Sequence, residues 1–230
     1  FDGNTFDFQV AGEFTLVEST DDNNPLTVQA RTAPAPTPDG VSDSLSNYTA
    51  VAVEFDGQEI AIYSGEENPV VVNGDAITLA VGESRTVRDS GIEITRPEIQ
   101  GDDEEGGSDF YQIDLNDQER LIVQVFENRL DPQIQLSDER ESNVTGVFGN
   151  NDGNPNNDFV LPDGTILDDP SLEQINNQFA DAWRITDPNN SLLVQEGEDL
   201  STINNTDFPR LAITIDNFQE ELDLDDEEVS

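Results

Sequence analysis

The stretch VAVEFDGQEIAI, residues 51–62, carries the pattern that decides the fold. Apolar residues alternate with small or polar ones on both sides of Asp56-Gly57 (Val51, Val53, Phe55, Ile60 and Ile62). Alternation with a period of two predicts a β-strand with one face buried. Asp-Gly is a favoured two-residue hairpin turn, because both positions tolerate positive φ. The stretch therefore predicts two antiparallel strands joined by a tight turn.

The same pattern recurs along the chain. Apolar runs at 70–72 and 77–81 flank Asn73-Gly74, and alternating residues at 111–115 and 121–125 flank Asn116-Asp117, with Ile134 and Leu136 following. Three hairpins at this spacing predict an all-β core, a sandwich or a barrel. Ala33 to Gly40 (APAPTPDG) is expected to be a proline-rich loop. One helix is expected late in the chain: Asp169 can cap it, Pro170 suits its first turn, and Leu172, Ile175, Phe179 and Trp183 recur at helical spacing.

The charge is extreme: 51 acids against 9 bases, all of them arginine, give a formal net charge of −42. Such self-repulsion opposes compaction unless salt screens it or bound cations neutralise it. Nucleic acids and anionic membranes carry the same sign, so neither is expected as a partner. No apolar run approaches the roughly 20 residues of a membrane helix, so no membrane insertion is expected. The absence of cysteine excludes disulfides and thiolate metal sites.

One loop, between Gly149 and Asp158, is rich in oxygen donors. Asn150, Asp152 and Asn154 stand at alternate positions, and Asn157 and Asp158 follow together. Alternating oxygen-bearing residues on a loop with glycines can wrap a hard cation, and Ca²⁺ accepts carboxylate, amide and main-chain oxygens together. Neither possible register has the glycine and glutamate positions of an EF-hand. Spacing alone leaves two readings open, a calcium site or a loop that merely turns the chain.

A resemblance favours the first reading. The stretch GVFGNNDGNPNNDF, residues 146–159, resembles the signature loop of von Willebrand factor type D domains. The opening FDGNTFDFQ, residues 1–9, followed by Gly12-Glu13-Phe14, is similar to the first strands of that family. FADAWRI, residues 179–185, resembles its closing segment. The three matches occur in the family's order and span residues 1 to about 186.

The resemblance implies an antiparallel β-sandwich with one structural calcium ion. The implied ligands are the side chains of Asn150, Asp152, Asn157 and Asp158, a main-chain oxygen of Asn154, and Asp2 from the opening segment. Relatives with a Cys-Gly-Leu-Cys run assemble through disulfides, but the aligned residues 145–148 contain no sulfur. A domain over 1–186 is expected, with an acidic C-terminal extension over 187–230 that is a linker or the start of a neighbouring unit.

The expected role is an extracellular or cell-surface structural module whose calcium braces the fold and its assembly, with self-association or other surface proteins as partners. An adhesin module that binds a foreign ligand is the alternative. Catalysis is not expected, because the chain lacks His, Cys and Lys, although a two-carboxylate hydrolase stays arithmetically possible. The acidic stretches 102–105 and 223–228 could bind further calcium weakly, and a strand is predicted at 211–215.

Overall fold

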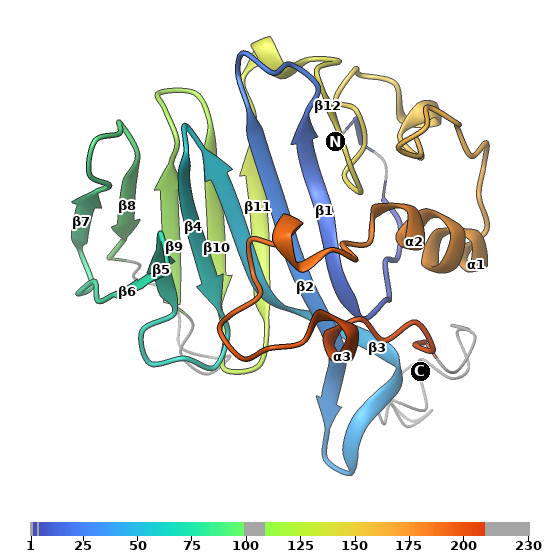
Figure 1. The fold of residues 1–230 in the computed structure, drawn as a ribbon, viewed down its shortest axis with the longest axis horizontal. Coiled ribbons are helices and arrows are strands. Elements are labelled where there is room, and N and C mark those ends of the chain that lie inside the picture. Colours follow the sequence, from blue (N-terminus) through green and yellow to red (C-terminus); the bar gives the residue numbers. More distant parts are fainter. Residues whose placement is uncertain (1, 4, 99–108, 210–230) are drawn as a thin grey trace, which may run out of the picture.

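The long strand β3 (Gly40–Phe55) organises the fold. It pairs with β2 (Leu26–Thr37) on one side, and on the other with β4 (Gln58–Tyr63) and, at Tyr48, with β11 (Leu130–Gln135). In the computed structural model, which describes residues 2–3, 5–98 and 109–209, two branches of antiparallel sheet therefore diverge from β3 (Figure 1).

The two branches form two layers. One runs β12 (Val144–Thr145), β1 (Gly12–Ser19), β2, β3, β4, β5 (Val70–Val72) and β6 (Asp75–Ile77). The other continues from β3 through β11, β10 (Arg120–Val125), β9 (Asp109–Asp114), β8 (Glu93–Arg96) and β7 (Glu83–Thr86). Figure 1 shows β9–β11 behind β2–β4, and the predicted all-β sandwich is confirmed.

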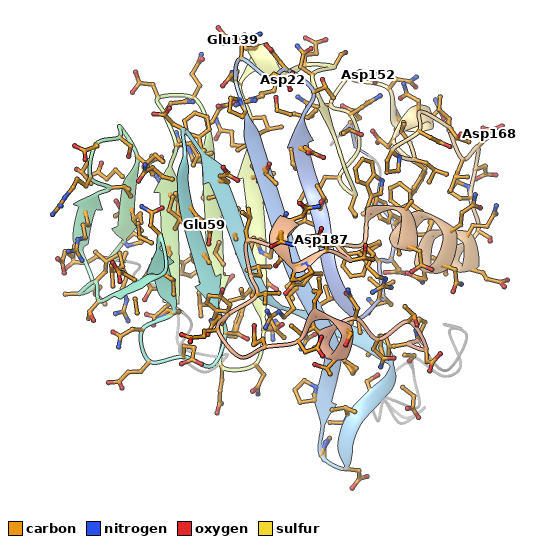
Figure 2. The ribbon with its side chains drawn as sticks, in the orientation of Figure 1. Asp22, Glu59, Glu139, Asp152, Asp168 and Asp187 are labelled. Carbon is orange, nitrogen blue, oxygen red and sulfur yellow. The ribbon has the colours of Figure 1, made fainter. Side chains whose placement is uncertain are left out.

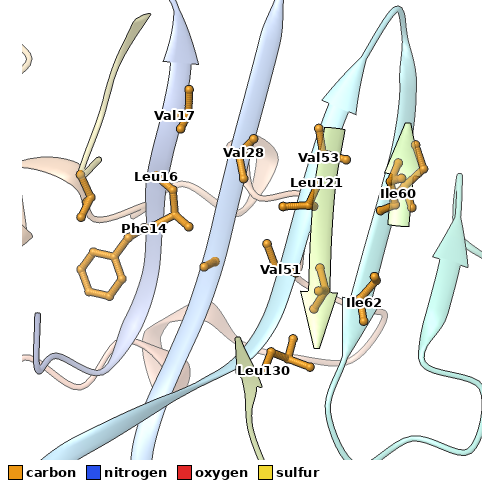
Figure 3. Packing of buried hydrophobic residues seen from close by; sticks show 14 of the residues in the cluster. Phe14, Leu16, Val17, Val28, Val51, Val53, Ile60, Ile62, Leu121 and Leu130 are labelled. Carbon is orange, nitrogen blue, oxygen red and sulfur yellow. The ribbon is translucent and has the colours of Figure 1, made fainter. Parts of the chain in front are cut away.

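The core lies between these layers. The alternating residues of the 51–62 hairpin, Val51, Val53, Ile60 and Ile62, are fully buried and pack in one cluster with residues of β9 and β10. Figure 3 shows Leu121 of β10 among them. The turn at Asp56-Gly57 has φ values of 50° and 69°, as a type I′ hairpin requires. The hairpin that decided the fold class is therefore confirmed in its residues, register and turn.

Two local expectations need correction. The proline-rich stretch is not a loop, because β2 runs to Thr37 and β3 begins at Gly40; the pair projects as a ribbon below the sheet (Figure 1). The register shifts between Pro34 and Pro36, where a bulge accommodates residues that cannot donate a main-chain hydrogen bond. After Asn73-Gly74 the strand spans only Asp75–Ile77, and Val81 is exposed rather than buried.

The expected helix spans Leu172 to Trp183 in three consecutive pieces: α1 (Leu172–Gln174), a π-helical segment η4 (Ile175–Phe179) and α2 (Ala180–Trp183). Its buried stripe is the predicted one, except that Leu172 is 40% exposed. The cap is Ser171, not Asp169: Ser171 and Gln174 form a reciprocal capping box, while Asp169 lies at φ 47° before the helix.

The chain after the helix returns across the sheet. It contains the 3₁₀ turn η5 (Pro188–Asn190) and the short helix α3 (Leu200–Ile203). Two further 3₁₀ turns, η2 (Asp138–Arg140) and η3 (Pro155–Asn157), lie before the main helix. Leu193 is fully buried against Ala50 and Ala52, on the face of β3 turned away from the main core. Residues 188–208 thus cover part of the outer sheet face, and the boundary at 186 stays a prediction. The strand predicted at 211–215 lies outside the described residues.

Two buried ion pairs tie distant segments to this scaffold. Glu13 of β1 is fully buried and pairs with Arg31 of β2, which also pairs with Glu198 of the returning segment. Arg140 is 1% exposed and pairs with Glu119 at 2.8 Å. Burial opposes ionisation of Glu119, but hydrogen bonds from Arg140 and its neighbours outweigh it and lower the pKa of Glu119.

Candidate metal centre

The oxygen-rich loop follows β12 and is fixed to the edge of the sheet by main-chain hydrogen bonds. Val147 N–H donates to Thr15 O at 3.1 Å, and Phe148 N–H donates to Leu16 O at 3.0 Å. A Cβ at Gly146 would lie 2.4 Å from Leu16 O, so the approach of the loop to β1 requires glycine there. The loop therefore leaves a rigid strand at a defined position.

Asp2 meets this loop, as the resemblance implied. Its two carboxylate oxygens accept hydrogen bonds from the main-chain N–H groups of Asp152, at 3.1 Å, and Gly153, at 2.9 Å. The first residues and a loop 150 positions later are thereby held together. Asp2 has a φ of 50° and Gly3 a φ of 78°, so the chain turns at this Asp-Gly pair.

Four buried side-chain oxygens in the loop have no hydrogen-bond partner among residues 2–3, 5–98 and 109–209: Oδ1 of Asn150, Oδ1 of Asn157, and Oδ1 and Oδ2 of Asp158. A buried polar atom without a partner costs about 1–3 kcal/mol, and more when it is charged. Four of them on one short loop form an acceptor-rich site, and no hydrogen bond within the described part of the chain satisfies them. A cation is the ligand that such oxygens fit.

Asp152 orients two of these oxygens. Its Oδ2 accepts hydrogen bonds from the side-chain amides of Asn157, at 2.7 Å, and Asn150, at 3.2 Å. Because both amide groups point their Nδ2 atoms at Asp152, both Oδ1 atoms point away from it. Hydrogen bonds from Asn157 and from the main chain of Asn154 lower the pKa of Asp152, so it is a carboxylate at neutral pH.

Asp158 is the most deeply buried acid of the loop, with 2% of its surface exposed. A Cβ at Gly149 would lie 2.3 Å from Asp158 Oδ1, and Gly149 has a φ of 91°, so only glycine fits beside this carboxylate. Burial, together with the nearby Asp2 carboxylate, raises the pKa of Asp158 to about 6. Two carboxylates in one partly buried site repel each other unless a positive charge lies between them.

The last predicted ligand, Asn154, lies at the exposed end of the loop. Its side chain caps η3 by accepting a hydrogen bond from Asn156 N–H at 3.3 Å. Its main-chain oxygen accepts only a long hydrogen bond, 3.4 Å from Asn157 N. The side chain of Asn154 is therefore occupied in shaping the turn, while its main-chain oxygen has capacity for a ligand.

An aromatic cluster that was not predicted from the sequence packs directly beside the site. Phe159, next to Asp158, stacks edge-on against Phe6 at 4.9 Å and against Phe179 of η4 at 5.2 Å between ring centroids. Trp183 completes the support by donating from Nε1 to Val160 O at 3.0 Å. The three segments of the family resemblance thus converge on one site. The spacing of phenylalanines in the sequence gave no signal that they would meet.

Acidic side chains alone do not make a metal site in this part of the molecule. Across residues 2–3, 5–98 and 109–209, no three acidic side chains are grouped closely enough to hold a metal by themselves. Amide and main-chain oxygens would therefore have to complete the coordination of a calcium ion. The acidic stretches 102–105 and 223–228 lie outside the described residues.

A model of a known domain family matches this chain, whereas no individual curated protein matches it at a significant level. The family model for the von Willebrand factor type D domain matches residues 1–165, a range that includes both Asp2 and the complete oxygen-rich loop. The match covers most of the 230 residues, and the chain belongs to the von Willebrand factor type D domain family.

Proposed function

We propose that this chain is an extracellular structural module that binds one calcium ion in the loop 150–158, and that the ion braces the fold. Domains of its family occur as structural or adhesive modules in extracellular proteins and are not enzymes. The observation that carries the proposal is the group of four buried, unpartnered oxygens on Asn150, Asn157 and Asp158. Calcium would satisfy all of them at once.

The residues divide the work of binding. Asn150, Asn157 and Asp158 would contribute the buried oxygens, and the main-chain oxygen of Asn154 would add another. Asp152 positions the two amides, and Asp2 brings a further negative charge from the start of the chain. The carboxylates of Asp2, Asp152 and Asp158 give this region a net negative charge, although they are not grouped closely enough to hold an ion by themselves, and amide and main-chain oxygens would complete the coordination of Ca²⁺. When bound, the ion would supply the positive charge that the site lacks.

The overall charge supports an environment rich in cations. Labelled acids such as Asp22, Glu59, Glu139 and Asp168 point outward from different sides of the molecule in Figure 2. A surface of this kind is stabilised by salt and by divalent ions, both of which an extracellular medium supplies. No helix among the described residues is long and apolar enough to cross a membrane.

Isothermal titration of calcium into the chelator-treated chain tests the proposal. We expect one ion bound per chain with a dissociation constant of about 0.1–1 mM or tighter, as in extracellular calcium modules, and weaker binding of magnesium. Asp158→Asn should abolish the binding heat. Asp168→Asn, which changes the charge equally at an exposed position, should not. No heat with the unaltered chain, or equal heat with both variants, would contradict the assignment.

A further inference from the structure

The end of the sandwich remote from the calcium loop has two open sheet edges. Among the described residues, β7 is the last strand of one branch and pairs with β8 alone, and β6 is the last strand of the other and pairs with β5 alone. A groove of about 580 Å³ lies where these strands approach each other, lined by residues of β5, β6, β7 and β8. In Figure 1 these strands stand at the left edge, opposite the loop of the candidate metal centre.

The outer side of β7 offers main-chain groups to a further strand. Just beyond β7, Val87 N–H donates to the oxygen of Ile92, the residue before β8, and in an antiparallel pair the hydrogen-bonding residues alternate. Arg85 therefore faces β8 with its main chain, while Ser84 and Thr86 turn their N–H and C=O groups outward. All four residues of β7 are exposed. An edge of this kind is a template for β-strand addition.

The groove has an apolar floor and a basic wall. Val87 and Ile94 are buried beneath it, and Val72 and Ile77 line it from the other layer. Its basic residues are Arg85 and Arg88, while Asp75 is its single acid. Alternate apolar side chains of an added strand could pack on the floor and its acids could reach the arginines.

These two arginines differ from the rest of the described chain. The other six arginines among residues 2–3, 5–98 and 109–209 each form an ion pair with a carboxylate (Arg31, Arg96, Arg120, Arg129, Arg140 and Arg184). Within the same ranges Arg85 and Arg88 have no carboxylate within ion-pair distance, although the chain has 51 acids. Like charges disfavour pairing of β7 with another β7, whereas an acidic strand is attracted.

One segment of this chain has the matching sequence. Residues 211–226 read LAITIDNFQEELDLDD, in which Leu211, Ile213 and Ile215 alternate and acids follow from Asp216. We propose that this C-terminal segment of one copy adds as a strand to β7 of a second copy, with its apolar residues on the groove floor and its carboxylates on Arg85 and Arg88.

The geometry favours a second copy over the same chain. Asn205 bridges to Ala11 at the start of β1, and Phe208 N–H turns back to Asn205 O. Leu211 can lie at most about 10 Å beyond Phe208. The branch from β1 to β6 crosses five strand spacings, about 24 Å, so the same chain cannot place residues 211–215 on β7. A contact between two different surfaces repeats from copy to copy and builds an open chain of subunits.

The first test uses a fluorescent synthetic peptide of residues 211–226 and the full chain, at dilution and at fixed ionic strength. We expect saturable binding, about tenfold weaker to Arg85→Glu, because one charge-assisted contact is reversed. Arg129→Glu, which makes the same charge change at an exposed arginine outside the groove, should bind the peptide like the unaltered chain. A peptide with Ile213→Pro should bind more weakly, because proline interrupts strand pairing. Absence of binding, or equal weakening by the two arginine variants, overturns the proposal.

Sedimentation velocity of the full chain is the second test. The chain should form larger species as its concentration rises, and Arg85→Glu/Arg88→Glu should remain a monomer. A monomer at every concentration would refute docking between copies. Both tests are run in chelator and in calcium, because the groove lies away from the ion loop. If the chain binds no calcium, the melting temperatures and titration heats will show it while peptide binding to β7 is unchanged. The calcium site and the docking of residues 211–226 can therefore be refuted independently.

Discussion

Replacement of Asp158 by asparagine tests the calcium brace most directly, because it should stabilise the chain without the ion and remove the stabilisation that the ion provides. Without calcium, the Asp158 carboxylate is buried with both oxygens unpartnered. Its folded pKa of about 6 exceeds the ordinary value of 3.8, so ionisation opposes folding as pH rises through this window. At pH 7.5 the ionised Asp158 lowers the stability of the calcium-free fold by the full amount of this shift, about 3 kcal/mol at 1.4 kcal/mol per pKa unit.

The variant removes that charge, so in EDTA it should be more stable than the unaltered chain by up to about 3 kcal/mol. In a chain of this size 1 kcal/mol corresponds to about 2–4 °C in Tm, which predicts an increase of up to about 6–12 °C. Calcium at 100 times its Kd should stabilise the unaltered chain by about 2.7 kcal/mol, and should leave the variant unchanged. In calcium the two proteins should therefore melt at similar temperatures.

Differential scanning calorimetry in EDTA and in calcium measures all four values, with Asp168→Asn as the control that keeps the calcium response. The reasoning is refuted if Asp158→Asn melts below the unaltered chain in EDTA and still gains stability from calcium. That result would mean that Asp158 is held by ordinary hydrogen bonds and that any calcium binds elsewhere.

Three further substitutions test separate parts of the structure. Gly149→Ala should remove the calcium response and lower the free energy of unfolding in urea by about 2–3 kcal/mol, because both its φ and the adjacent carboxylate exclude a Cβ. Its control is Gly153→Ala, which has φ 81° and open space and should lower the free energy of unfolding by about 1 kcal/mol. Glu119→Gln should cost about 3–5 kcal/mol because it leaves the buried Arg140 unpaired. The folded state lowers the pKa of Glu119, so the ion pair should stabilise the unaltered chain above about pH 4.5 and less as pH falls further. In acid-unfolding curves the stability difference between the two proteins should therefore shrink below that pH. Leu193→Ala should lower the free energy of unfolding in chemical denaturation by about 2–5 kcal/mol, because residues 188–208 fold with the sheet. A loss well under 1 kcal/mol would mean that these residues detach from the sheet independently.

Local patterns in the sequence predicted the strands but not all of their limits. Alternation and Asp-Gly turn chemistry are properties of a few neighbouring residues, so the 51–62 hairpin could be recognised without knowing its partners. The stretch from Ala33 to Gly40 was misjudged because its prolines favour loops in isolation. Its strand character comes from pairing with β3, and a bulge absorbs the missing donors. The helix cap shifted from Asp169 to Ser171 for a similar reason, because the capping box with Gln174 provides two reciprocal hydrogen bonds.

The sequence named the residues of the candidate site, whose use as calcium ligands stays a prediction, but it did not show how their side chains are arranged. Donor spacing gave Asn150 to Asp158, and the family resemblance added Asp2, which the structure places against the loop. That Asp152 orients two amides while Asp158 lies buried depends on side-chain directions that spacing cannot supply. The covering segment around Leu193 was equally hidden, because a few apolar residues suffice once an alanine-rich sheet face is available to receive them.

The joining of Asp2 to a loop 150 residues later has a consequence for the order in which the chain can fold. β1 finds β2 within a few residues, but its outer edge remains unpaired until β12 and the loop have been made. At synthesis rates of about 5–20 residues per second, that interval is about 7–30 s. During this time the first strand is an open edge, exposed to proteases and to pairing with other nascent chains. The fold is complete only when the loop has been synthesised. A chain truncated before the loop would leave the first residues and the outer edge of β1 unpaired, even if all of its hairpins had formed.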